Sequence, residues 1–179
     1  MSSRSGVPGY VLAGGASRRM GQHKATILLD GEPLAARMLR VLMAGGCAGA
    51  TLVGNLSTLD DLGPVLREPD GPYHPLRGVA AALATCASPL LLVAPCDLVS
   101  LQPEHIAALL AVGGPCVARA EGRIHPLLAV IATDQAARAA DLADIGASAM
   151  ALTADLAPVD LPPGALLDAN RPEDVPRSR

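Results

Sequence analysis

The fold is decided by the stretch GYVLAGGASRRMGQHK, residues 9–24. A short apolar run at residues 9–13 leads directly into two glycines, and two arginines and a lysine follow. An apolar run of this length predicts a strand, and glycine lets the backbone approach a ligand closely. Successive backbone N–H groups combined with cations suit a polyanion such as a triphosphate. The segment therefore predicts a strand followed by a phosphate-binding loop.

The spacing inside this loop excludes two common nucleotide motifs. The distances from Gly15 to Gly21 and Lys24 do not fit the pattern G-x-x-x-x-G-K-[ST], and the glycines do not fit G-x-G-x-x-G. Lys24 is the only lysine in a chain with thirteen arginines, which suggests that a compact point charge is needed there. The alternative interpretation is a plain strand–helix turn with solvated arginines.

Beyond the loop, short apolar runs alternate with amphipathic stretches. Strands are expected at residues 9–13, 50–54, 64–67, 90–94, 116–118, 127–131 and 166–169, and helices at 32–44, 75–87, 103–112, 134–142 and 148–154. The continuous apolar run 90–94 is typical of a central parallel strand covered on both faces. We expect one domain over residues 1–179, with frayed ends at 1–7 and 174–179. The expected class is α/β: a Rossmann-like, three-layer α/β/α fold with a mostly parallel sheet.

The composition excludes several classes of function. With a net charge of −3 the chain lacks the basic footprint of a nucleic-acid binder, and without Phe or Trp it lacks the usual platforms for base stacking. It has no apolar run of the roughly 18 residues that span a bilayer, and no signal-peptide pattern at its start. The four cysteines show no C-x-x-C spacing and are expected to be buried and reduced. We expect a cytoplasmic protein that binds neither nucleic acid nor membranes.

The pattern L-A-G-G-x-S-x-R-M-G-x-x-K, residues 12–24, resembles the signature loop of molybdenum cofactor guanylyltransferases, the MobA family. Further matches are V-G-N at 53–55, E-P-D at 68–70, P-L-x-G at 75–78, P-C-D at 95–97, H-P at 125–126 and D-A-N-x-P-E at 168–173. The resemblance covers roughly residues 8–175 and implies a nucleotidyltransferase with a nucleotide-diphospho-sugar transferase-like fold. It also implies transfer of GMP from GTP to the terminal phosphate of molybdopterin or Mo-molybdopterin, with pyrophosphate as the second product.

The nucleotide phosphates are expected at the glycine loop. Its binding residues would be Leu12, Ala13, Gly14 and Gly15, with the amides of the last three holding the triphosphate. Arg19 and Lys24 would neutralise charge on the α-phosphate and on the leaving pyrophosphate. Together with Asp97 they form the expected catalytic set, since such transfers depend mainly on positioning and charge stabilisation.

The expected metal site begins at Asp97, which follows the most apolar strand. A carboxylate there suits Mg²⁺, with Mn²⁺ as a substitute, and the resemblance implies the same. A helix cap is a poor alternative, because Asp97 precedes the helix at 103 by six residues. Asp168 and Asn170 alternate along the last expected strand, so both can face one cleft. Asn170 is the expected second metal residue and Asp168 the weaker one, with an Asx-turn as the alternative.

The base and ribose are expected near Asn55 and Asp70, which follow the second and third strands. By resemblance both contact GTP, and an amide and a carboxylate can read a base edge or ribose hydroxyls. Asp70-Gly71-Pro72 is also a plausible turn. Because the chain lacks Phe and Trp, we expect hydrogen bonds and aliphatic walls to hold the guanine rather than an aromatic sandwich.

The acceptor side is less sharply defined by the sequence. His125 matches the family's His-Pro and is expected either to line the pterin side or to be a structural histidine. His74 and Arg77 depart from the family pattern of a glycine before Pro75 and a small residue before Gly78. Molybdoenzymes or their chaperones are the further partners implied. The alternatives are a cytidylyl or other nucleotidyltransferase, for which the second loop glycine is atypical, or a non-catalytic carrier of nucleotide or cofactor.

Overall fold

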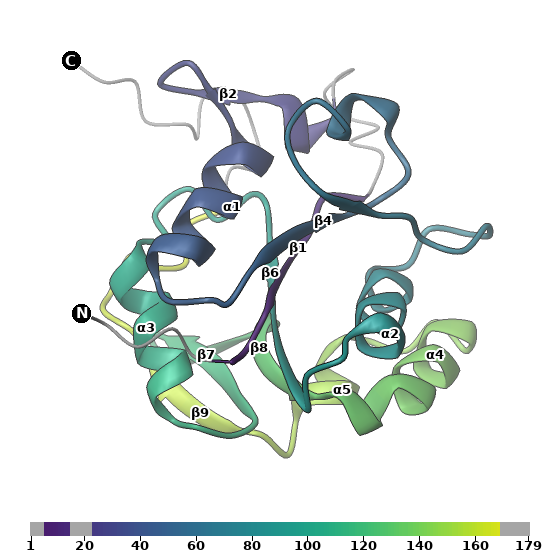
Figure 1. Cartoon of the computed structure of the whole chain (residues 1–179). Coiled ribbons are helices and arrows are strands. Elements are labelled where there is room, and N and C mark those ends of the chain that lie inside the picture. The colour runs from purple at the N-terminus through teal and green to yellow at the C-terminus, as the bar shows by residue number, and fades with distance from the viewer. Residues whose placement is uncertain (1–5, 15–22, 169–179) are drawn as a thin grey trace.

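The apolar run before the glycine loop forms β1 (Gly9–Leu12), which lies inside a seven-stranded sheet of order β5-β4-β1-β6-β8-β7-β9 (Figure 1). This is a computed structural model, and it describes residues 6–14 and 23–168. The other strands are β2 (Leu28–Leu29), β3 (Glu32–Pro33), β4 (Ala50–Val53), β5 (Val65–Leu66), β6 (Leu90–Pro95), β7 (Cys116–Ala120), β8 (Arg123–Ala132) and β9 (Ala157–Asp160). The helices are α1 (Leu34–Ala44), α2 (Pro75–Thr85), α3 (Pro103–Ala111), α4 (Ala136–Asp144) and α5 (Met150–Thr153), with 3₁₀ turns at Lys24–Thr26, Ser57–Leu59 and Thr133–Gln135.

The sheet is mostly parallel, as predicted. β1 pairs in parallel with β4 on one side and with β6 on the other. In this register Leu12 stands beside both Val53 and Pro95. The three strands therefore end in one row, and the residues that follow them gather at one edge of the sheet.

β8 is antiparallel to both of its neighbours, β6 and β7. It follows β7 through a tight turn in which Glu121 and Gly122 both have positive φ, 50° and 75°, a conformation typical of two-residue hairpins. The β7–β8 pairing shifts register between Val117 and Ala118, where Ala129 and then His125 are the opposite residues. Pro126 lies inside the skipped stretch, and a proline has no N–H to contribute to a strand pairing.

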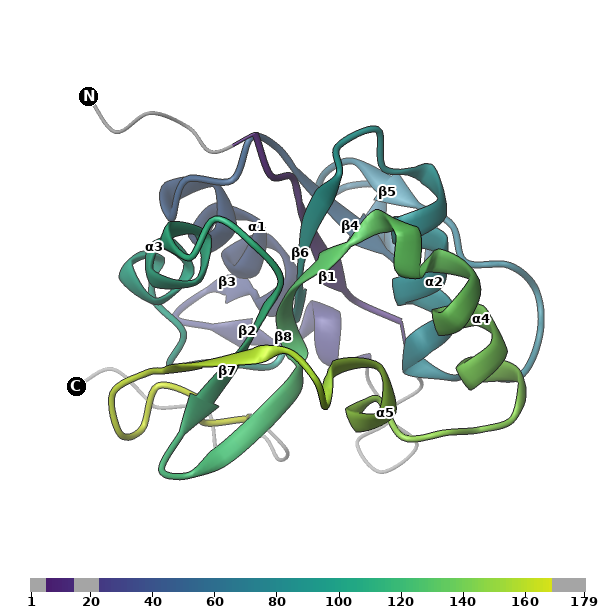
Figure 2. The same ribbon diagram turned by 90° about the horizontal axis from the view of Figure 1, so that it is seen from below.

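Helices cover both faces of the sheet, which gives the three layers that the sequence predicts (Figures 1 and 2). α1 and α3 lie on one face, and α2, α4 and α5 on the other. Alternate residues of β6 enter the two cores: Leu92 and Ala94 pack toward the first, Leu91 and Val93 toward the second. All four are fully buried, so this strand is covered on both faces, as its continuous apolar sequence predicts.

Several elements differ from the sequence-based expectation; β8, for example, begins at Arg123 rather than at residue 127. α1 begins at Leu34 rather than at residue 32, because β3 pairs with β2 immediately before it. The strand expected at 166–169 is not formed by its described residues; Asp168 makes one isolated bridge to Leu98, and the chain turns just before it. The edge strand is instead β9, parallel to β7. Pro158 argues against a strand there, yet an edge position tolerates proline.

None of the helices in residues 6–14 and 23–168 is long and apolar enough to cross a membrane.

Candidate active site

The segments that follow β1, β5 and β6, together with β8, surround a cavity of about 340 Å³ at the carboxyl edge of the sheet. Ligands in open α/β sheets bind at this edge. The walls of this central cavity come from segments far apart in the sequence: Leu12, Ala13, Gly14, Lys24, Tyr73, Pro75, Pro95, Cys96, Asp97, His125, Leu127 and Asp168. The fold therefore brings together the predicted phosphate loop, metal carboxylates and acceptor-side histidine.

Lys24 and Asp97 form an ion pair in this cavity, with Nζ 2.8 Å from Oδ2. The lysine begins the 3₁₀ turn after the glycine loop, and the aspartate follows β6. Their side chains are 29% and 20% exposed, so both retain access to a ligand. Two of the three predicted catalytic residues thus meet across 73 positions of sequence.

The donor set fits a magnesium site that the substrate completes. In the described part of the chain, no three His, Cys, Asp or Glu side chains gather closely enough to hold a metal by themselves. Mg²⁺ usually takes one or two carboxylates together with substrate phosphates and water. Asp97 and Asp168 both line the central cavity and supply such a pair.

Asp168 is brought beside the Asp97 loop by backbone pairing. It bridges Leu98, and the amide of Val99 donates to the carbonyl of Leu167 at 3.0 Å. The sequence placed Asp168 and Asn170 on a strand at this edge. The structure supplies a single bridge at Asp168, while Asn170 lies outside the described residues.

A second cavity of about 240 Å³ shares Gly14 and Tyr73 with the first. Its walls also include the ends of β4 and β5 and the first turn of α2: His23, Asn55, Leu56, Glu68, Pro69, Gly71, Pro72 and Arg77. We call it the β4–β5 cavity. It lies where the base and ribose are expected.

Glu68 supplies the carboxylate of this cavity. Its carboxyl group lies between two glycines, since a Cβ added to Gly14 would stand 2.5 Å from Oε1 and one added to Gly78 would stand 2.8 Å from it. Burial raises the pKa of Glu68 above its ordinary value. Asp70 is exposed and does not line either cavity. Sequence reasoning missed Glu68, although it lies only two residues after β5, within the matched E-P-D.

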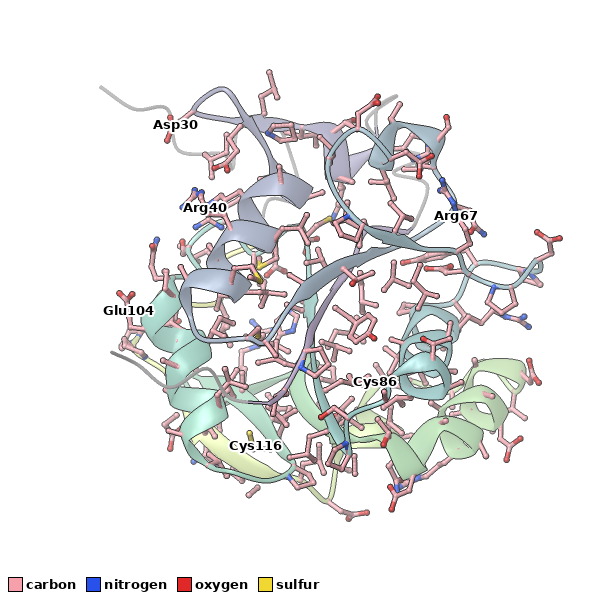
Figure 3. All side chains as sticks on the ribbon, viewed as in Figure 1. Asp30, Arg40, Arg67, Cys86, Glu104 and Cys116 are labelled. Atoms are coloured by element: carbon pink, nitrogen blue, oxygen red, sulfur yellow. The ribbon has the colours of Figure 1, made fainter. Side chains whose placement is uncertain are left out.

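Asn55 connects the ends of β4 and β5. Its Oδ1 accepts from the Glu68 amide at 2.9 Å, and its Nδ2 donates to the Glu68 carbonyl at 3.1 Å. Arg67, at the outer edge of the molecule, donates to the carbonyl of Leu56 at 2.9 Å and pairs with Asp60 (Figure 3). The two hydrogen bonds from the side-chain amide of Asn55 fix the backbone of Glu68. They leave one N–H of Nδ2 and one lone pair of Oδ1 for a ligand.

The amide of Ala13 is committed to the sheet rather than to a phosphate. It donates to the carbonyl of Val53 at 2.9 Å, which extends the β1–β4 ladder by one residue. The expected role of this N–H in holding a triphosphate is therefore corrected. Gly15 and Arg19 lie outside the described residues.

Tyr73 is a residue of the site that sequence reasoning passed over. It is 59% exposed and lines both the central and the β4–β5 cavity. An exposed aromatic ring at the junction of two polar cavities offers one face against which a base can stack. The signal was available, because Tyr73 is one of only two aromatic residues in the chain.

His125 lines the central cavity from β8. Its Nδ1 is buried and has no hydrogen-bond partner among the described residues. Burial lowers the pKa of His125, and the weaker attraction of Asp168 and Asp97 raises it in part. His125 and Asp168 also line a third cavity of about 210 Å³ beside the β7–β8 hairpin.

The two departures from the family pattern have structural roles. His74 caps α2, with Nδ1 accepting from the amide of Leu76 at 3.2 Å. Arg77 pairs with Asp144 of α4 at 3.0 Å. Neither lines the central cavity, so neither faces the acceptor side there.

The cysteines are structural. Cys47, Cys96 and Cys116 are buried, Cys86 is half-buried, and none forms a disulfide. Burial raises the pKa of Cys47 and Cys96 to about 12, so both stay protonated thiols. Cys116 lies against α3, far from Cys86 at the end of α2 (Figure 3). Cys96 lines the central cavity, where it serves as an apolar wall.

The chain is similar in sequence to known NTP transferases. The MobA-like NTP transferase domain model matches residues 9–159. A molybdenum cofactor guanylyltransferase from Rhodobacter capsulatus is 31% identical over 96% of this chain and 94% of its own length.

Two solved structures share the fold. The molybdopterin-guanine dinucleotide biosynthesis protein A of Archaeoglobus fulgidus superposes with a TM-score of 0.73 at 19% identity, over 94% of this chain and 95% of its own. The manganese complex of a Mycobacterium tuberculosis H37Rv protein superposes with a TM-score of 0.70 at 15% identity, over 96% of each chain.

Proposed function

The chain belongs to the family of MobA-like NTP transferase domains, and on that premise we propose that it transfers GMP from GTP to the terminal phosphate of molybdopterin or Mo-molybdopterin. It is a nucleotidyltransferase with a role in molybdenum cofactor biosynthesis. The proposed products are the guanine dinucleotide cofactor and pyrophosphate.

One observation carries the proposal: Lys24 and Asp97 meet at 2.8 Å in a cavity that also includes Gly14. A cation, a carboxylate and a glycine backbone at the carboxyl edge of a parallel sheet suit a triphosphate with its divalent cation. Asp97 would hold Mg²⁺ or Mn²⁺, with Asp168 or Asn170 as its second protein partner. When bound, the cation supplies positive charge to the phosphoryl oxygens.

The reaction needs no activated side-chain nucleophile, because the acceptor phosphate is already one. Its oxygen attacks the α-phosphorus of GTP, a new P–O bond forms, and the bond to the β-phosphate oxygen breaks. The electron pair of that bond leaves with pyrophosphate. Catalysis then consists of holding the two substrates in line and stabilising the charge that develops.

Lys24 changes its partner in this scheme. Without nucleotide, its ammonium group neutralises Asp97. When the triphosphate enters, Lys24 would turn to its phosphates, with Arg19 as the second predicted cation, and the Asp97 carboxylate would be available to hold the divalent cation. The ion pair thus keeps a half-buried carboxylate compensated until substrate arrives.

The β4–β5 cavity would hold the guanosine. A partly buried carboxylate can accept hydrogen bonds from the two adjacent N–H groups of guanine, and Glu68 lies in this cavity. Asn55 would contribute its remaining N–H, and the ring of Tyr73 its face. Asp70, which the sequence predicted to contact GTP, lines neither cavity, so it would reach the nucleotide only from the exposed surface beside the β4–β5 cavity. The acceptor would approach on the other side, past His125 and Asp168.

Thermal-shift titration with GTP, CTP, ATP and UTP in the presence of Mg²⁺ tests the nucleotide. A ligand at 100 times its Kd stabilises a protein by about 2.7 kcal/mol, so a selective response to GTP is expected. A preference for CTP would instead indicate a cytidylyltransferase.

Pyrophosphate release after addition of molybdopterin tests the transfer. Release that depends on GTP, Mg²⁺ and molybdopterin together is the expected result. Binding of GTP without release would favour a carrier of nucleotide or cofactor.

A further inference from the structure

Arg37 is a buried cation outside the predicted site. It lies on the inner side of α1 and is only 7% exposed. Arginine is almost never buried to this degree unless its donors are satisfied. The neighbouring carboxylate does not serve it, since Glu32 forms a two-bond ion pair with Arg40 on the exposed side of the helix.

The guanidinium of Arg37 binds the loop that carries Asp97. Nη2 donates to the carbonyl of Leu101 at 2.7 Å, and Nη1 donates to the carbonyl of Leu98 at 3.3 Å. Both carbonyls lie within the connection between β6 and α3, residues 96–102. A planar, forked group can span two oxygens in a way that the single ammonium group of lysine cannot reproduce.

The same loop also positions the second carboxylate. Leu98 forms the bridge to Asp168, and the amide of Val99 donates to the carbonyl of Leu167. Arg37 therefore fastens one segment on which both cavity carboxylates depend. Asp97 directly precedes Leu98, whose carbonyl Arg37 binds, and Asp168 pairs with the backbone of Leu98.

We propose that Arg37 is a positioning residue that holds Asp97 and Asp168 at the separation a divalent cation needs beside the triphosphate. The proposal rests on the proposed function, because the cation is that of the nucleotide. Groups that orient metal ligands from outside the coordination shell typically contribute 10–100-fold to metal affinity or activity. Loss of the two hydrogen bonds of Arg37 should therefore lower the affinity for the cation far more than the stability of the fold.

The test compares Arg37→Met, Arg37→Lys and the control Val41→Ala, a buried truncation on the same helix whose side chain packs in the core. Mn²⁺ binding in the presence of GTP is measured by electron paramagnetic resonance, and hydrogen exchange follows the amide of Val99. The Mg²⁺ concentration for half-maximal turnover is measured beside the KM for GTP.

Arg37→Met is expected to weaken Mn²⁺ binding and to raise the half-maximal Mg²⁺ concentration by about tenfold or more. Faster exchange at Val99 should accompany this, whereas the KM for GTP at saturating Mg²⁺ should change less. Arg37→Lys should recover part of the affinity, and it remains informative if the methionine variant does not fold. Val41→Ala should leave cation affinity within twofold of wild type.

Equal cation affinity in wild type and in a folded Arg37 variant would overturn the proposal, as would an equal loss in Val41→Ala. Wild-type binding of Mn²⁺ and GTP without transfer to molybdopterin would refute the proposed function alone. Absence of Mn²⁺ binding in the wild type would overturn both.

Discussion

Replacement of Lys24 by Met should change the affinity for a divalent cation in opposite directions with and without GTP. The ammonium group lies 2.8 Å from the Asp97 carboxylate, where it would compete with a cation for that group. Its removal should tighten the binding of Mn²⁺ alone. With GTP present, Lys24 should instead bind phosphate, so its removal should weaken the ternary complex.

The magnitude follows from the geometry of the ion pair. Two unit charges at this distance attract by ~1.5 kcal/mol in bulk water and by several times more in a protein interior. The two side chains are 29% and 20% exposed, and measured pairs at exposed sites contribute about 0.2–1 kcal/mol. A value of about 1 kcal/mol corresponds to roughly fivefold tighter Mn²⁺ binding. A lost hydrogen bond between a charged group and phosphate, about 1.5–3 kcal/mol, corresponds to roughly 10–100-fold weaker binding with GTP.

Titration of Mn²⁺ followed by electron paramagnetic resonance, with and without GTP, measures both constants. Arg40→Met is the matched control, since it removes one positive charge from an exposed pair with Glu32 outside the cavities. It should leave both constants within twofold. Weaker Mn²⁺ binding by Lys24→Met in the absence of GTP would refute the competition between the ammonium group and the cation.

Three further predictions concern the walls of the site. Because burial raises the pKa of Glu68, ionisation of this carboxyl group destabilises the folded chain as the pH rises through the folded pKa. Glu68→Gln should therefore raise Tm by roughly 1–3 °C at pH 7 but not at pH 4. The same variant should lower the affinity for GTP, measured by thermal-shift titration, about 10-fold or more. An unchanged GTP affinity would exclude Glu68 from base recognition. Because burial lowers the pKa of His125, the unfolded chain binds more protons than the folded chain below about pH 6.5. The Tm of His125→Gln should therefore fall less than that of wild type between pH 7 and pH 5, with His23→Gln, at an exposed position, as the control. Parallel plots of Tm against pH for His125→Gln and wild type would contradict this. Gly78→Ala places a Cβ 2.8 Å from Oε1 of Glu68 but also raises the helix propensity of α2. Tm should therefore stay within about 2 °C of wild type, while the affinity for GTP falls because Glu68 is displaced. An unchanged affinity for GTP would show that Glu68 can move without loss of binding.

The sequence predicted the centre of the fold well, because there the local and the tertiary signals agree. The apolar run of β6 is buried on both faces, and the glycine loop follows a strand that lies between β4 and β6. Strands that end in one row bring Lys24 and Asp97 together, although neither residue predicts the other locally.

The sequence failed where a partner, rather than a local preference, decides the outcome. Pro158 lowers the strand propensity of β9, yet the segment is the edge strand beside β7. Glu68 is the partly buried carboxylate rather than the exposed Asp70, because two glycines leave room for its side chain. The two hydrogen bonds of Arg37 could not be predicted either, since their acceptors are backbone carbonyls, which every residue possesses.

The central place of β1 has a consequence for biosynthesis. This strand leaves the ribosome before either of its neighbours, β4 and β6, and at about 5–20 residues per second β6 follows roughly 4–17 s later. During that interval β1 can pair with β4 on one side, but its other side has no strand to join. Asp168 emerges later still, so the two cavity carboxylates can meet only after all the strands of the sheet have been synthesised.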